Sequence, residues 1–154
     1  MKIILLALSL FIACSVSTFA QSSQATTTDD IAAITKTLNY YIEGGTNRDS
    51  ATFAKAFMTD GQMLFMRNDT LRIVPLKEFV AGMKPGEKAK RICRIAGIQV
   101  AGTAASARLE LVYDDFTLVD FMNLLKTKDG WKIVGKIFAR EDKPKDQSAA
   151  QTKK

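Results

Sequence analysis

The stretch DFMNLLKTKDGWKIVGKIF, residues 120–138, predicts two antiparallel strands joined by a tight turn. Asp129-Gly130 is a strong signal for a two-residue hairpin loop, and the segments on both sides are rich in β-branched and aromatic residues. Because side chains alternate along a strand, this loop places Asp120 on the same face as Trp131. The face expected to look into the domain holds Asp120, Met122, Leu124, Trp131, Ile133 and Ile137.

The opposite face of this hairpin is basic and is expected to meet solvent or a partner subunit. It carries Lys132, Lys136 and Arg140. The other residues on it are Val119, Phe121, Asn123, Leu125, Val134 and Phe138. A patch with this many apolar side chains usually marks an interface, so an interaction module is one prediction for the protein.

The rest of the chain predicts helices followed by long strands. Residues 27–30 fit a helix N-terminus, an apolar stripe at helical spacing follows, and Gly44-Gly45 is expected to end this helix. Short helices are expected after Asp49 and after Pro75. Strands are expected at residues 62–67, 71–74, 90–100, 104–113, 116–126 and 131–140. This order predicts an α+β domain with its helices packed on one curved antiparallel sheet.

The first 20 residues have the pattern of a secretory signal peptide. A basic Lys2, an apolar run at residues 3–12 and small residues up to Ala20 predict cleavage after Ala20. The run is shorter than the roughly 20 residues of a membrane-spanning helix. Residues 10–14 also resemble a lipobox, in which Cys14 would be lipidated and would hold the protein at a membrane. Both alternatives predict an exported protein, periplasmic or secreted.

The organisation expected from composition is one domain between two polar segments. After the signal peptide at 1–20, residues 21–28 are expected to be a disordered tether, residues 29–140 the domain, and residues 141–154 a disordered polar tail. The 154-residue chain has a formal net charge of +6 with its charges dispersed. Beyond Cys14 the only thiol is Cys93, so no intrachain disulfide is expected in the exported form.

The absence of histidine excludes several kinds of site. The chain contains no histidine, so it has no imidazole base and no histidine metal ligand. No metal site and no cofactor are expected, and no glycine-rich phosphate loop or CxxC pair is present. The basic segment 84–94 lacks interleaved aromatic residues, and no nucleic-acid partner is expected.

The inward acid is the main candidate for chemistry. A carboxylate in apolar surroundings needs a hydrogen-bond partner or a changed pKa, and the partners suggested by residue type are Tyr40, Tyr41, Tyr113 and Arg94. Asp120 is thus a candidate general base of a lyase or isomerase, or a structural ion-pair partner. The residues expected to line a ligand pocket are Tyr40, Tyr41, Phe57, Met58, Met63, Phe65, Tyr113, Asp120, Met122 and Trp131. Each of them could equally fill the core.

The C-terminal run carries a resemblance to a known family. The segment 116–138, with Asp129-Gly130-Trp131-Lys132 at its centre, resembles the end of nuclear transport factor 2-like proteins, and in particular the SnoaL-like group called "putative lumazine-binding". The early block 38–63 is also similar to that family. One departure is Met58, which stands where the family commonly has histidine.

The resemblance implies a cone-shaped fold and a pocket at its open end. It also implies a homodimer formed through the outer sheet face, because members of the superfamily commonly pair in this way. The function expected from it is non-catalytic binding of a small, partly apolar ligand, with lumazine or a related heteroaromatic compound suggested only by the family name. The fold itself does not decide the chemistry.

Overall fold

The computed structural model describes residues 18–144, and the side chains of residues 28–144. Three helices and six strands follow one another along the chain. They are α1 (Thr18–Asn47), α2 (Ser50–Ala54), β1 (Phe57–Arg67), β2 (Thr70–Pro75), α3 (Leu76–Ala81), β3 (Ile92–Ala101), β4 (Ala104–Val112), β5 (Phe116–Thr127) and β6 (Gly130–Asp142). The strand positions agree with the sequence-based prediction to within a few residues, except that β1 begins earlier, before Gly61.

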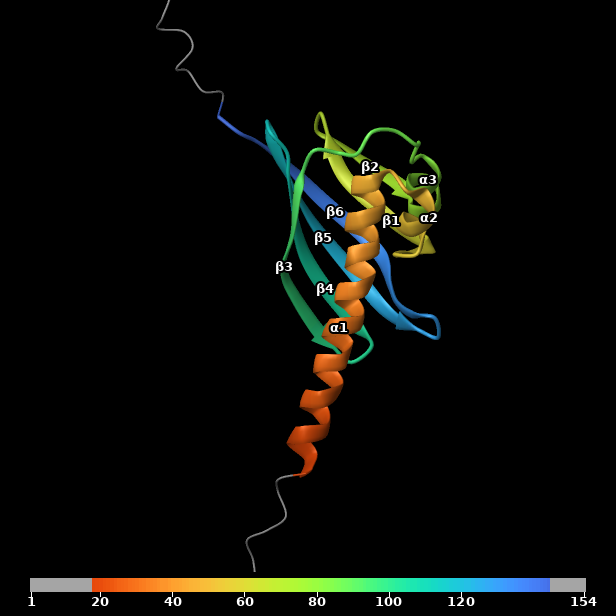
Figure 1. Cartoon of the computed structure of the whole chain (residues 1–154), viewed down its shortest axis with the longest axis vertical. Coiled ribbons are helices and arrows are strands. Elements are labelled where there is room, and N and C mark those ends of the chain that lie inside the picture. The colour runs from red at the N-terminus through yellow and green to blue at the C-terminus, as the bar shows by residue number, and fades with distance from the viewer. Residues whose placement is uncertain (1–17, 145–154) are drawn as a thin grey trace, which may run out of the picture.

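The six strands form one sheet in the order β2-β1-β6-β5-β4-β3. The segment from β3 to β6 is the expected antiparallel meander, and β2 is antiparallel to β1. The pairing of β1 with β6 is parallel, so the sheet is mixed where an antiparallel one was predicted. In Figure 1 the sheet curves around α1, which lies along its concave side, while α2 and α3 lie beside the β1 end. The α+β prediction with helices packed on a curved sheet is confirmed.

Helix α1 is longer than predicted at both ends. It begins at Thr18, so residues 21–28 are helical and do not form the expected tether; no glycine or proline interrupts the chain before Gly44. It also continues through Gly44-Gly45 to Asn47, because these glycines serve a close approach. A Cβ at Gly44 would lie 2.4 Å from the Phe53 nitrogen of α2. The helix ends at Asn47, and the next residue, Arg48, has a φ of 59°.

The predictions for the chain termini are tested only in part. The signal peptide and lipobox predictions fall mostly on residues 1–17, which lie outside the described residues. Of the expected polar tail, Glu141 and Asp142 belong to β6, and residues 145–154 lie outside the described residues.

The predicted cap of the second helix is present, since Asp49 Oδ1 accepts hydrogen bonds from the backbone nitrogens of Ala51 and Thr52.

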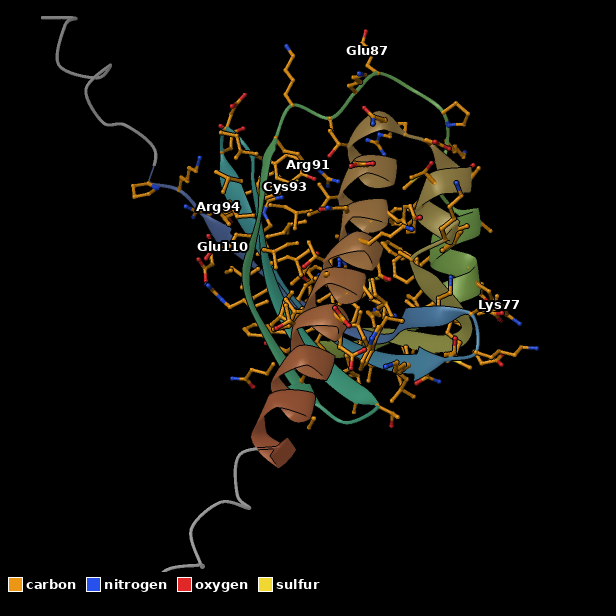
Figure 2. The ribbon with its side chains drawn as sticks, turned by 60° about the horizontal axis from the view of Figure 1, so that its bottom comes forward. Lys77, Glu87, Arg91, Cys93, Arg94 and Glu110 are labelled. Atoms are coloured by element: carbon orange, nitrogen blue, oxygen red, sulfur yellow. The ribbon has the colours of Figure 1, made fainter. Side chains whose placement is uncertain are left out.

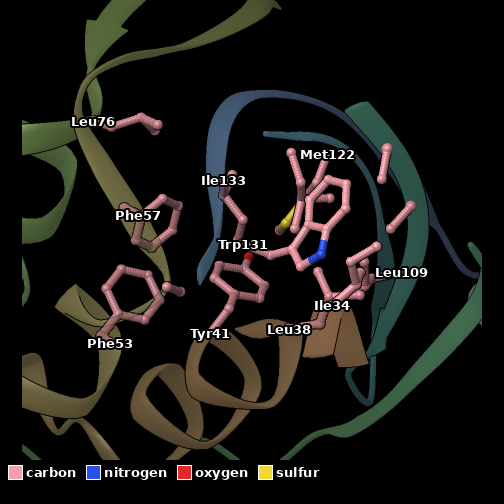
Figure 3. Close-up of a cluster of buried hydrophobic side chains, with 14 of the residues drawn as sticks. Ile34, Leu38, Tyr41, Phe53, Phe57, Leu76, Leu109, Met122, Trp131 and Ile133 are labelled. Atoms are coloured by element: carbon pink, nitrogen blue, oxygen red, sulfur yellow. The ribbon is translucent and has the colours of Figure 1, made fainter. Parts of the chain in front are cut away.

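The core fills the space between α1 and the concave face of the sheet. Ile34 and Leu38 of α1 pack against Leu109, Met122 and Trp131 of the sheet, all at most 3% exposed. Figure 3 shows this group on one side of Tyr41 and the rings of Phe53 and Phe57 on the other. Burial of these apolar side chains is the main stabilising contribution to the free energy of folding.

A bulge in β6 changes which of its side chains face the core. Near the turn, Leu124 pairs with Ile133 and both are buried, as predicted. The next pair is Asn123 with Gly135, so Val134 is an extra residue in β6. Beyond that point Met122 pairs with Lys136 and Asp120 pairs with Phe138. A one-residue shift exchanges the two faces of a strand.

The face assignment of β6 was therefore wrong beyond the bulge. Lys136 and Phe138, predicted outside, lie on the inner face, and Ile137, predicted inside, is 54% exposed. In β5 the faces are as predicted: Val119 pairs with Glu110 on the outer face, although it is buried there. The turn itself consists of Lys128-Asp129, with Gly130 at φ 93° in the first strand position. Trp131 therefore pairs with Lys126 and not with Lys128 as predicted. Because this shift is two residues, the side chains near the turn stay on their predicted faces.

Candidate functional site

Three polar side chains meet on the inner face of the sheet. Tyr41 of α1 donates a hydrogen bond of 2.6 Å from Oη to Asp120 Oδ2. Lys136 Nζ donates to Tyr41 Oη at 2.9 Å and lies 2.9 Å from Asp120 Oδ1. Asp120 has no exposed surface, and Lys136 is 4% exposed. We call this group the Tyr41–Asp120–Lys136 triad.

The triad is buried, and each of its groups changes the hydrogen bonding or the pKa of the others. Asp120 Oδ1 accepts no hydrogen bond of regular geometry among the described residues, so the ion pair with Lys136 is its compensation. Burial lowers the pKa of the Lys136 ammonium, while the Asp120 carboxylate opposes that shift and the Arg91 guanidinium adds to it. Burial, and after it the charge and hydrogen bond of Asp120, raise the pKa of Tyr41 well above its ordinary value.

Aromatic rings surround the Lys136 ammonium. Its Nζ lies 5.1 Å from the ring centroids of Tyr41 and Phe138, and 5.5 Å from that of Phe79. A desolvated cation at this range of an aromatic face is attracted by the electron density of the ring. The ammonium carries three N–H groups; among the described residues it makes one hydrogen bond, to Tyr41, and one ion pair, with Asp120. At least one N–H group therefore has no partner among the described residues.

Lys136 borders a cavity of about 430 Å³. Its polar or charged lining residues are Tyr41, Arg48, Glu78, Arg91 and Lys136. Its apolar lining consists of Phe53, Met63, Phe65, Phe79, Met83, Leu111, Leu118 and Phe138, with Gly45 and Gly82 completing it. A concave, mostly apolar space with a few convergent polar groups is the usual form of a small-molecule site.

Arg91, just before β3, is fixed at one side of this cavity. Its Nε donates to Thr46 Oγ1 at 3.1 Å, its Nη1 to Tyr113 Oη at 2.8 Å, and its Nη2 to the Ile42 carbonyl at 3.4 Å. Figure 2 shows Arg91 on the side of β3 that faces α1, and Arg94 with Glu110 on the opposite side. Arg91 therefore joins the end of α1 to the sheet at the cavity wall.

The structure brings only some of the predicted pocket residues together. Tyr41, Met63 and Phe65 line the cavity. Asp120 lies behind Tyr41 and Lys136, and it is not part of the lining. The remaining predicted residues lie elsewhere: Phe57, Met122 and Trp131 in the core, Met58 exposed, Tyr40 beside Lys55, and Tyr113 behind Arg91.

The partners suggested for Asp120 divide in the same way. Tyr41 is its hydrogen-bond partner, whereas Arg94 forms an ion pair with Glu110 on the outer face. Trp131 has a different acid as partner, since its Nε1 donates to Asp30 Oδ1 at 3.0 Å. The Lys126 ammonium also lies 2.7 Å from Asp30 Oδ1. The hydrogen bonds from Lys126 and from Trp131 lower the pKa of Asp30.

Sequence reasoning missed Lys136, Phe138, Phe79 and Arg91 as site residues. The signal for the first two was Gly135, because a glycine inside a strand pattern often marks a bulge. For Arg91 no local signal exists, since its partners Thr46 and Tyr113 come from distant parts of the chain.

Other kinds of site are not supported among the described residues. No group of three or more His, Cys, Asp or Glu side chains is placed to hold a metal ion in residues 28–144. Within the described part of the chain, no helix has the length and apolar character needed to cross a bilayer.

Comparison with solved structures gives the fold a name. An NTF2-like protein of unknown function from Shewanella baltica OS155 is 28% identical, with a TM-score of 0.65, over 84% of this chain and 100% of that chain. An NTF2-like protein of unknown function from Methylobacillus flagellatus KT is 30% identical, with a TM-score of 0.63, over 73% of this chain and 93% of that chain. One from Silicibacter pomeroyi DSS-3 is 20% identical with a TM-score of 0.66, over 75% and 98% of the two chains, and shows the fold alone.

The sequence comparisons agree with this fold. No curated protein matches the chain. The family model described as "Putative lumazine-binding" matches residues 29–139, which is most of the chain and nearly the whole folded domain. The chain has an NTF2-like fold and belongs to the "Putative lumazine-binding" family.

Proposed function

We propose that this protein is exported and binds a small, partly apolar ligand in the cavity, without catalysing its conversion. The observation that carries the proposal is a buried ammonium, Lys136 Nζ, at the wall of a cavity lined mostly by aromatic and aliphatic side chains. Such an arrangement offers a ligand one directed polar contact and a large apolar surface. Tyr41 and Asp120 hold that ammonium in place.

The alternative in which Asp120 acts as general base fits the geometry less well. Its Oδ2 accepts from Tyr41, its Oδ1 pairs with Lys136, and the carboxylate does not line the cavity. A general base has to reach a proton of the substrate directly or through one water. In this arrangement Asp120 acts on a ligand through Lys136 and is a positioning residue.

The test is to fill the cavity from one wall and measure binding. In Met83→Trp the larger side chain replaces a half-buried lining residue. Met66→Trp is the matched control, because Met66 is exposed on the outer face of β1. Titration calorimetry with 2-naphthoate and with 2-naphthalenemethanol should show binding to the wild type and Met66→Trp, and loss of both in Met83→Trp. Absence of binding to all three proteins would refute the proposal.

A second proposal concerns assembly and is favoured by the outer face of the sheet. A row of apolar side chains crosses four strands there, through the register pairs Phe121 with Ile137, Ile137 with Leu64, and Leu64 with Ile73. Three of the four are largely exposed, and Met66 and Leu71 extend the row. An exposed apolar strip of this kind fits a symmetric homodimer through the sheet.

Sedimentation equilibrium tests the dimer. The wild type should sediment as a dimer, and Phe121→Lys should sediment as a monomer with unchanged secondary structure. A wild type that stays monomeric over the concentration range would refute the interface.

A further inference from the structure

The charges around the cavity do not balance. Lys136, Arg91 and Arg48 contribute positive charge to its lining, and Glu78 is the one acid that lines it. The charge of Lys136 is compensated from behind by Asp120. Among the described side chains, no carboxylate oxygen lies within ion-pair distance of Arg91. The cavity is therefore left with an excess of positive charge that no described side chain neutralises.

Among the described residues, the groups that accept hydrogen bonds from Arg91 are all neutral. Its three contacts are a threonine hydroxyl, a tyrosine hydroxyl and a backbone carbonyl, and none of them carries a formal charge. A guanidinium has five N–H groups, so two remain available after these contacts. Arginine side chains with free N–H groups and a fixed plane are well suited to carboxylates and similar oxyanions.

Arg91 and Lys136 act on the same space. Both line the cavity, and the positive charge of Arg91 adds to burial in lowering the pKa of Lys136. Each cation has at least one uncommitted N–H group. Four flat aromatic side chains line the same cavity: Phe53, Phe65, Phe79 and Phe138. This combination suits a molecule with a flat apolar body and an acidic group.

We propose that the cavity is an oxyanion site, in which Arg91 and Lys136 recognise the carboxylate of a flat, mostly apolar organic acid. The proposal rests on the proposed ligand-binding function and adds the chemical class of the ligand. Lys136 provides a directed hydrogen bond from a charged donor. Its charge is already balanced by Asp120, so Arg91 provides the positive charge that balances the carboxylate of the ligand.

The two naphthalene probes test this class directly, because they share a ring system and differ in charge. The wild type should bind 2-naphthoate about tenfold or more tightly than 2-naphthalenemethanol, as expected for a charge-assisted hydrogen bond in a desolvated site. Arg91→Gln should reduce that preference to near unity, chiefly through weaker binding of 2-naphthoate. Arg91→Lys should keep part of it, since the charge remains without the planar fork.

The matched control is Arg94→Gln, which removes the same charge from the opposite face of the sheet. It should leave the preference unchanged. Equal loss in Arg91→Gln and Arg94→Gln would overturn the assignment to Arg91, because it would indicate a general field of the protein. If Arg91→Gln does not fold, Arg91→Lys and the salt dependence of the wild-type preference provide the same test.

Failure of this inference is distinguishable from failure of the proposed function. Equal affinity of the wild type for both probes, with binding lost in Met83→Trp, would overturn the oxyanion site and leave the cavity as a ligand site. No binding of either probe would overturn both.

Discussion

Two charged clusters lie on opposite faces of the same sheet, and only one of them is protected from water. The Tyr41–Asp120–Lys136 triad faces the cavity, and Asp120 and Lys136 are 0% and 4% exposed. On the outer face, Glu110 pairs with Arg94 and Arg108, whose side chains are 65% and 44% exposed. The two clusters use similar chemical groups at similar separations, so burial is the main difference between them.

The difference in burial indicates which of the two clusters is the better candidate for a functional role. An exposed ion pair is screened by water and contributes little to stability. A buried pair has lost its hydration, and replacing it by apolar residues often leaves a protein equally stable. A buried pair beside a cavity therefore fits the proposed binding role, because stability alone does not require it. The predictions below measure how large the difference between the two clusters is.

The largest effect is expected for Lys136→Met. This change leaves the Asp120 carboxylate buried with Tyr41 as its one remaining partner among the described residues. Removing one partner of a buried ion pair typically destabilises a protein by about 3–5 kcal/mol. Urea unfolding followed by circular dichroism should show a fall of this order in the free energy of unfolding.

The double variant Lys136→Met/Asp120→Asn is the control for that result. The asparagine keeps an oxygen for Tyr41 Oη but carries no charge, so the double variant should be more stable than Lys136→Met alone. If the second change gives no recovery, the loss in Lys136→Met comes from packing of the lysine stem against the aromatic rings, and the ion-pair explanation is wrong.

A smaller effect is expected for Tyr41→Phe. The ring keeps its contacts with Phe53 and Phe57, but the hydroxyl that donates to Asp120 and accepts from Lys136 is lost. Leaving buried polar groups without a partner costs about 1–3 kcal/mol. The same urea titration measures it, with Tyr40→Phe as the matched control because Tyr40 is only half-buried and lies outside the triad. Equal losses in the two variants would contradict the role given to Tyr41.

Much of this arrangement could be predicted from local sequence patterns. The hairpin between β5 and β6, the cap at Asp49 and the inward direction of Asp120 follow from turn residues, capping residues and alternation, which act over a few neighbouring positions. Those patterns also placed Trp131 and Ile133 in the core correctly. They fail where a single extra residue, Val134, exchanges the faces of β6 and turns Lys136 inward.

The rest of the site depends on contacts between distant parts of the chain. Arg91 contacts Thr46 and Tyr113, and β1 pairs in parallel with β6, although most of the sheet separates them in sequence. No turn or capping signal reports such pairings, because they are decided by packing of the whole domain. The cavity residues Phe79 and Phe138 come together for the same reason.

The alkaline pH dependence tests Tyr41 by comparing the wild type with Tyr41→Phe, in which Lys136 is still present. The pKa of Tyr41 is raised well above the 10.0 of a free tyrosine, so the folded protein keeps a proton that the unfolded chain loses. Its contribution is present below pH 10 and is lost as the pH rises toward the pKa of the folded state. The wild type should therefore lose stability more steeply above pH 10 than Tyr41→Phe does. Parallel curves for the two proteins would show that Tyr41 ionises equally in both states.

The smallest effect is expected on the outer face, for Arg94→Gln. The hydrogen bond from Arg94 lowers the pKa of Glu110, so that pKa should rise toward its ordinary value in the variant, as followed by NMR titration. The stability linked to this shift is present at neutral pH and is lost as the pH falls through the pKa of the folded state. Because the pair is exposed and screened, the melting temperature at pH 7 should stay within the error of the wild-type value. A loss as large as that of Lys136→Met would show that exposure does not separate the two clusters, and the case for a binding role based on burial would fail with it.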